Sequence, residues 1–135
     1  MGPTVSVLMV IALVVVLGLA VAGVALYRGI RSVKVAQQVV HDYYTALQER
    51  RFDDAYLMLC PDTRSSHTRE AFESAVVARP PTAHELTGEL RLNRMPRRTR
   101  SMVGVRVTYA DGTDAACMVS LTRLGGYWRV SDSPY

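Results

Sequence analysis

The chain has 135 residues, with 16 Lys and Arg against 12 Asp and Glu, so its formal net charge is +4 and its length is that of one domain. Every charged side chain lies at or after Arg28, so an uncharged N-terminal segment precedes the part that must fold in water. This second part has the apolar content of a globular domain, which excludes intrinsic disorder, a coiled-coil rod and a multi-domain enzyme.

The N-terminal segment is long and apolar enough to cross a membrane. After a tail at positions 1–4, residues 5–27 carry no charge, and about 20 such residues span the hydrocarbon core as a helix. The sequence therefore predicts a transmembrane helix and a single-pass protein of the plasma membrane. A cleavable signal peptide is the alternative, because Ala20-Val21-Ala22 is a small-x-small pattern, but the basic leader of a signal peptide is missing.

Basic residues follow the span in the juxtamembrane segment 28–34. Arg28, Arg31 and Lys34 are placed to meet lipid phosphates at the membrane interface. Because positive charges favour the cytoplasmic side, they indicate a cytoplasmic C-terminal part.

The two cysteines bear on the same question. Cys60 and Cys117 are the only cysteines, and an even pair after a membrane segment is compatible with one disulfide outside the cell. Two buried reduced thiols, which behave as small apolar side chains, explain the pair equally well. The cysteines therefore offset the charge rule without deciding the side.

Helical periodicity predicts three helices in the first half of the domain at residues 35–135. The first covers residues 32–50, the second begins at Asp53 as its cap, and the third follows the cap residue Thr68. Residues 62–67 are expected to form a polar loop. The apolar stripe of the first helix consists of Ala36, Val40, Tyr43 and Leu47.

Beyond the third helix the period changes to two, which predicts strands. Asp111-Gly112 and Gly125-Gly126 are typical of hairpin turns between them. The prediction is an α+β fold in which three helices pack on a four-stranded antiparallel sheet with one buried face. The alternating segments are residues 86–92, 102–109, 114–123 and 127–132.

The order of these elements and two motifs resemble the nuclear transport factor 2-like superfamily, which includes ketosteroid isomerase. YYTALQERRFDDAY resembles the family's helix-turn-helix opening, and LTRLGGYWRVSD resembles its closing hairpin. The resemblance covers residues 35–132 and implies a cone-like domain. No extra strand or hairpin is recognisable between the second and third helices, so we expect a shallow cone, in which an enclosed catalytic pocket is disfavoured.

The resemblance is strongest to small domains that follow a single membrane helix in actinobacterial cell-envelope proteins. The use of 15 Arg against one Lys fits a GC-rich genome of that kind. The resemblance therefore implies an extracytoplasmic domain, against the charge rule.

An isomerase of this superfamily needs a carboxylate base in an apolar cavity and hydrogen-bond donors for an oxyanion. Tyr43, Tyr44 and Tyr56 are candidate donors, and with Trp128 they are candidate ligand- or partner-binding residues; packing in the core is the alternative. None of the strand positions expected to face inward carries Asp or Glu. We therefore expect no enzyme activity.

The segment 91–100 contains five arginines. It is a candidate surface for phosphate head groups, an acidic polymer or an acidic partner protein, and a solvated loop that guards a sheet edge is the alternative. No aromatic residues interleave with the arginines, so nucleic acid is not an expected partner. The residues expected to bind are Arg94, Arg97, Arg98 and Arg100.

The three histidines lack the spacing of metal ligands, so no metal or other cofactor is expected. They are His41, His67 and His84.

The leading prediction is a non-catalytic, membrane-anchored binding or scaffolding module, an accessory subunit of a bacterial envelope or membrane complex. Its partners would be the lipid bilayer and other membrane or envelope proteins. The small residues Gly18, Ala22 and Gly23 would allow close helix packing in a homo-oligomer, and a lone anchor is the alternative. The alternatives are a small-molecule-binding or isomerase-like pocket protein, which needs a deep apolar cavity, and a cytoplasmic regulator, which the charge rule favours.

Overall fold

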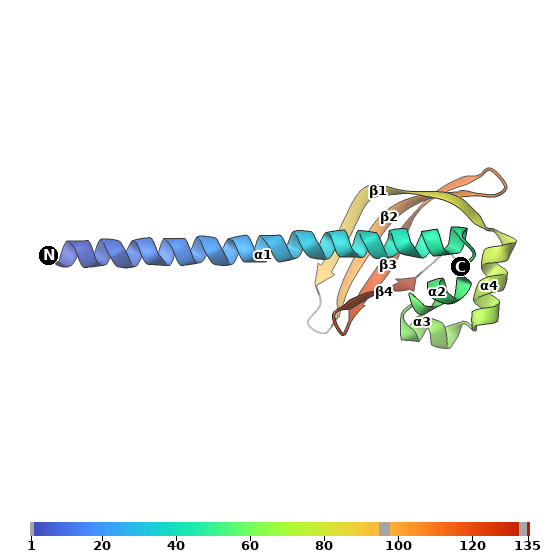
Figure 1. Cartoon of the computed structure of the whole chain (residues 1–135), viewed down its shortest axis with the longest axis horizontal. Helices are drawn as coiled ribbons and strands as arrows, with labels where there is room; N and C mark the ends of the chain where they lie inside the picture. Colours follow the sequence, from blue (N-terminus) through green and yellow to red (C-terminus); the bar gives the residue numbers. More distant parts are fainter. Residues whose placement is uncertain (1, 95–97, 133–134) are drawn as a thin grey trace. The chain divides into compact units, whose positions relative to one another are not determined.

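The structure is a computed structural model that describes the chain except residues 1, 95–97 and 133–134 and the side chain of Arg94. The chain forms two compact units, Met1–Lys34 and Val35–Tyr135. Figure 1 shows the elements in chain order. They are helices α1 (Pro3–Gln48), α2 (Phe52–Leu57), α3 (Pro61–Ser66) and α4 (Arg69–Ala78), then strands β1 (Pro81–Arg94), β2 (Thr99–Tyr109), β3 (Asp114–Leu124) and β4 (Tyr127–Asp132).

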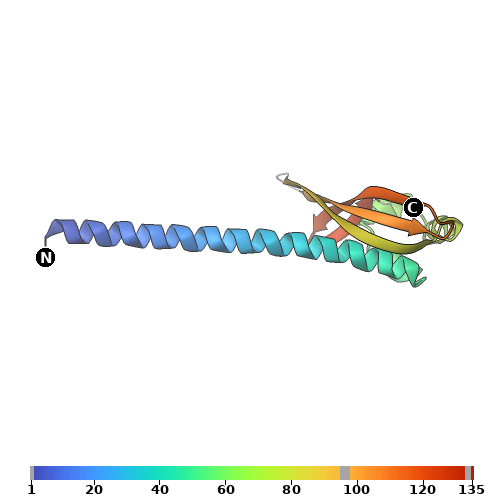
Figure 2. The same ribbon diagram turned by 90° about the horizontal axis from the view of Figure 1, so that it is seen from above.

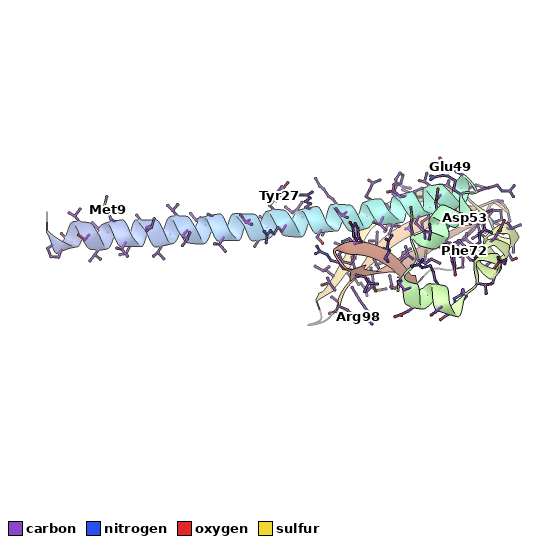
Figure 3. All side chains as sticks on the ribbon, turned by 60° about the horizontal axis from the view of Figure 1, so that its bottom comes forward. Met9, Tyr27, Glu49, Asp53, Phe72 and Arg98 are labelled. Carbon is purple, nitrogen blue, oxygen red and sulfur yellow. The ribbon has the colours of Figure 1, made fainter. Side chains whose placement is uncertain are left out.

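The first unit is the N-terminal part of α1. It contains an 18-residue window with a mean hydropathy of 3.1, none of which is buried. Side chains such as Met9 and Tyr27 project outward from the helix, at 73% and 64% exposure (Figure 3). This is the one helix of the described residues that is long and apolar enough to cross a membrane.

In the second unit, the rest of α1 packs against one face of the sheet (Figure 2). The predicted stripe is confirmed, because Ala36, Val40, Tyr43 and Leu47 are all buried. No proline interrupts the sequence between the apolar segment and this amphipathic segment, so a single helix contains both. Arg50 ends this helical stretch with a φ of 58°, in the left-handed region.

The sheet is an antiparallel meander in the order β1-β2-β3-β4, which confirms the predicted fold class. Val103 pairs with Val119, and Leu121 pairs with Val130, so their side chains lie on the same face and are buried against α1. Alternate residues lie on the opposite face, which we call the outer face. The predicted hairpin turns are confirmed by the positive φ values of Gly112, Gly125 and Gly126.

The short helices differ from the prediction in two places. Asp53 is not the cap of α2: the helix begins one residue earlier and Asp53 lies in its first turn, where a carboxylate suits the helix dipole. The expected loop at 62–67 is wrong, since α3 occupies it with Pro61 at its first position, where a missing N–H costs nothing. Thr68 caps α4 as predicted, its Oγ1 accepting from the Ala71 amide at 3.1 Å.

The segment between α2 and α3 covers the edge of β4. The Cys60 amide donates to the Val130 carbonyl at 2.7 Å, and the Val130 amide donates to the Met58 carbonyl at 2.8 Å. This short parallel bridge satisfies backbone groups that an edge strand would otherwise expose.

Strand β1 has a bulge at its centre. The pairing with β2 shifts register between Leu86 and Leu90, and Gly88 within this stretch has a φ of 82°. The bulge lies over Gly104 of β2, where an added Cβ would meet the Thr87 hydroxyl and lie 2.9 Å from the Glu89 Cβ. Gly104 is therefore required by the close approach of β1.

Candidate functional site

The structure joins two histidines that are 43 residues apart in the sequence. Nδ1 of His41, on α1, lies 2.9 Å from Nε2 of His84, on β1, and the ring centroids are 4.9 Å apart. Gln48 Oε1 lies 2.6 Å from Nδ1 of His84. Spacing along the chain could not reveal this pair, because packing of the helix on the strand brings it together.

The partners of Gln48 determine where the protons of this cluster lie. Its Nε2 donates to the Thr82 carbonyl at 2.6 Å, so its Oε1 faces His84 and accepts from Nδ1–H. Neutral His84 therefore carries its lone pair on Nε2 and accepts from Nδ1–H of His41. A proton added to Nε2 of His84 would leave both facing nitrogens as donors, unless His41 gives up its Nδ1 proton.

The surroundings of His84 favour its neutral form. Burial, and then the charge of His41, lower the pKa of His84. The Tyr44 ring stacks on His84 at 5.7 Å between centroids, and its hydroxyl lies 3.8 Å from the Cys117 sulfur. Burial, followed by Cys117, raises the pKa of Tyr44 above its ordinary range, so this hydroxyl stays protonated.

The predicted aromatic binding residues are mostly core residues. Tyr43 and Tyr44 are fully buried and Trp128 is 5% exposed, as packing in the core predicts, and a role for them in binding a ligand or partner stays a prediction. Tyr56 is half-buried, and its hydroxyl donates to the carbonyls of Arg64, at 3.0 Å, and His67, at 2.7 Å. It thereby ties α2 to the end of α3.

The core offers no acid for catalysis in the part of the chain that the structure describes. Its buried polar residues are Ser101 and Thr122, with no buried Asp or Glu among the described residues. Asp42 lies beside His41 in the sequence but is exposed and accepts from Gln38 at 2.8 Å. The histidine cluster therefore has no carboxylate base within it.

Both cysteines are free thiols, so the disulfide alternative is wrong for this fold. Cys60 is bonded to β4 at Val130, and Val130 pairs with Leu121. Cys117 lies four residues along β3 from Leu121, which is about 13 Å of strand. A disulfide requires Cα atoms within about 7 Å.

The arginine segment contains the end of β1, at Arg94, and the start of β2, at Thr99. Arg97 and the side chain of Arg94 lie outside the described residues, whereas Arg98 and Arg100 are exposed. Arg98 lies 3.7 Å from the Asp62 carboxylate in an exposed ion pair. Arg100 belongs to a cross-strand row on the outer face, because it pairs with Thr122, which pairs in turn with Arg129.

The basic residues that follow the span lie on α1 at positions 28, 31 and 34. Because successive members are three residues apart, they are neighbours on the helix surface. Arg28, Arg31 and Lys34 are exposed in the first unit. Their contact with lipid remains a prediction.

A shallow recess of about 540 Å³ lies between α3 and the end of β4. It has two carboxylates and one histidine, but the Thr63 hydroxyl is already used in a 2.9 Å bond to the Ser131 carbonyl. The described residues contain no cluster of three metal-binding side chains. The recess is lined by Asp62, Thr63, Ser66, His67, Ser131, Asp132 and Tyr135.

No family model and no curated protein matches the sequence. Among solved structures, a SEC-C motif containing protein from Rhodopseudomonas palustris is similar over 70% of this chain and 73% of its own, with 14% identity and a TM-score of 0.50. At that identity the likeness concerns the fold alone.

Two further structures overlay less closely. Aln2 from a Streptomyces species has 18% identity over 74% of this chain and 85% of its own, with a TM-score of 0.48. An NTF2-like protein of unknown function from Burkholderia pseudomallei has 18% identity over 69% and 84%, with a TM-score of 0.37.

Proposed function

We propose that the protein is a single-pass membrane protein whose second unit is a non-catalytic binding or scaffolding module, an accessory subunit of a bacterial envelope or membrane complex. The observation that carries this proposal is the apolar part of α1, which is exposed throughout its 18-residue window. Surface of this kind is unfavourable in water and favourable in lipid.

The interior of the second unit supports a binding role over an isomerase-like one. Tyr43, Tyr44 and Trp128, which would line a pocket, belong to the packed core, and no buried carboxylate accompanies them among the described residues. The resemblance to the nuclear transport factor 2-like superfamily agrees with this role, because one fold of that kind hosts many functions.

The outer face of the sheet is the surface that we propose contacts a partner protein. It lies opposite α1 and presents Met102 and Met118, both half-buried, beside the exposed Ala116 and Arg106. Methionine side chains adapt to irregular partner surfaces, and arginine is enriched at interfaces. Another membrane or envelope protein is the proposed partner.

We propose that the domain is extracytoplasmic, on the strength of the family resemblance. Free thiols at Cys60 and Cys117 withdraw the support that a disulfide would have added. The positive-inside rule predicts the opposite side. Labelling of single cysteines before and after the span in intact cells distinguishes the two sides.

The test uses the full chain in cells, with a photoreactive amino acid at Ala116 on the outer face or at Glu70 on α4. Both positions are exposed. We expect a discrete adduct from position 116 in the membrane fraction, resistant to alkaline carbonate, and none from position 70. Release by carbonate contradicts the anchor, and equal adducts from both positions contradict the docking face.

A further inference from the structure

The start of β2 and the β3–β4 turn lie at the same end of the sheet. Arg100, near the start of β2, pairs with Thr122, and Thr122 pairs with Arg129, near the start of β4; we call this end of the second unit the turn end. At the opposite end, Gln48 of α1 donates to the Thr82 carbonyl of β1. Because α1 runs from Val35 toward Gln48, the chain enters this unit at the turn end (Figures 1 and 2).

The turn end is strongly basic. Residues 90–110 and 115–131 contain no Asp or Glu, although each segment carries arginines. Asp62, 3.7 Å from Arg98, Asp132, at the end of β4, and the exposed Glu89, two residues before Arg91 on β1, are the acidic groups nearby. The arginines with described side chains here are Arg91, Arg98, Arg100 and Arg123, all exposed, and the half-buried Arg129.

Apolar side chains project beside these arginines. Tyr127, at the start of β4, is 70% exposed, and Leu92, near the end of β1, is 42% exposed. The Arg129 guanidinium lies 5.9 Å from the centre of the Tyr127 ring. Exposed tyrosine and leucine among basic residues are typical of surfaces that lie in the head-group region of a bilayer.

The chain limits how far this end can lie from the span. Residues 28–34 separate the apolar segment from Val35, and seven helical residues extend about 10 Å. This link is basic as well, with Arg28, Arg31 and Lys34 and no acidic residue. Other acidic residues lie at the end of this unit opposite the turn end. Glu49 follows the last residue of α1, Asp111 lies between β2 and β3, and Asp114 begins β3.

We propose that the turn end docks on anionic phospholipid head groups of the membrane that holds α1. This inference rests on the proposed membrane anchoring. It makes lipid phosphates the binding partner of the described arginines of the turn end. Docking leaves the centre of the outer face available to a protein. Each basic residue near an anionic surface strengthens attraction about fivefold, so two substitutions shift the docked-to-free ratio about 20- to 30-fold.

The experiment uses Trp128, the single tryptophan of the chain, which pairs with Arg123 at the turn end. The full chain is reconstituted in phosphatidylcholine vesicles with a dansyl lipid, with or without phosphatidylglycerol. We expect energy transfer from Trp128 to the dansyl lipid to rise with phosphatidylglycerol and to fall again at high salt, because salt screens the attraction.

Two double variants with the same change in net charge complete the test. Arg100→Gln with Arg129→Gln should lose the rise, whereas Arg50→Gln with Arg106→Gln, away from the turn end, should keep it. Equal loss in both would overturn the proposal in favour of net charge alone. No rise in the unmodified chain would also overturn it, and is the result expected if the arginines serve an acidic protein.

Alkaline carbonate extraction of the same vesicles distinguishes a failure of the membrane anchoring from a failure of the docking. Release of the chain contradicts the anchoring itself. Retention of the chain without a rise in energy transfer contradicts only the docking.

Discussion

At the scale of single residues, the imidazole pair is the contact between α1 and β1 that depends most directly on pH. His41 and His84 share one hydrogen bond at 2.9 Å, and Gln48 holds the second nitrogen of His84 as a donor. Protonating His84 removes the lone pair that His41 needs, unless His41 releases its own Nδ1 proton. The pair therefore stabilises the α1–β1 contact in its neutral form.

This pair predicts a loss of stability in mild acid. Because the folded-state pKa of His84 is below its ordinary value of 6.5, its stabilising effect is complete above that pH and is lost as the pH falls from 6.5 toward the lowered pKa. His84→Gln should flatten this part of the pH dependence. The measurement is urea unfolding of the micelle-bound chain, followed by Trp128 fluorescence between about pH 7.5 and 5.

The matched control for His84→Gln is His67→Gln. His67 lies exposed after α3, with its Nδ1 3.4 Å from the Thr63 carbonyl and away from the pair. The control should keep the pH dependence of the unmodified chain. If both variants or neither flattens it, the pair is not its source.

At the scale of elements, the bulge of β1 explains a constraint on β2 that periodicity does not show. Gly88 with its positive φ lets β1 gain two residues relative to β2 and fold over Gly104. The Glu89 Cβ, which is fixed to the backbone, lies 2.9 Å from the place of a Cβ at position 104. The sheet is therefore tightly packed at this point of its outer face.

Gly104→Ala should lower the free energy of unfolding by about 1–3 kcal/mol, since a methyl group forces the bulge away from β2. Adding Thr87→Ala should recover part of the loss, because the Thr87 hydroxyl is the nearest group to the new methyl. Urea unfolding measures both variants. A Gly104→Ala variant as stable as the unmodified chain would show that β1 moves freely at the bulge.

At the scale of the whole molecule, one helix serves two environments. Its N-terminal part has an apolar surface all round, while its C-terminal part buries one stripe and exposes polar residues on the other side. The two units are therefore joined without a loop. The side of the membrane on which the second unit lies decides which partners it can meet.

An impermeant maleimide applied to intact cells tests that side. Thr4→Cys lies before the span and Ser65→Cys lies on α3, and both positions are exposed. An extracytoplasmic domain predicts labelling at position 65 before lysis and at position 4 only after lysis. The reverse pattern would establish a cytoplasmic domain, and the unmodified chain, whose Cys60 is buried and Cys117 half-buried, serves as the blank.

The sequence by itself determined the elements whose cause is local. Each of these elements depends on residues that are close together in the sequence. They are the uncharged segment 5–27, the apolar stripe of α1, the glycine turns and the cap at Thr68. The fold class follows from their order. The short helix α3 was missed because its six residues have too few apolar positions to show a period.

Only the tertiary structure decided which distant residues meet. It paired His41 with His84, added Arg123 and Arg129 to the arginines of segment 91–100, and kept Cys60 apart from Cys117. It also placed Tyr43 and Tyr44 in the core. These outcomes depend on strand register and helix packing, which join residues without regard to their separation, whereas periodicity reports only which face of its own element a residue occupies.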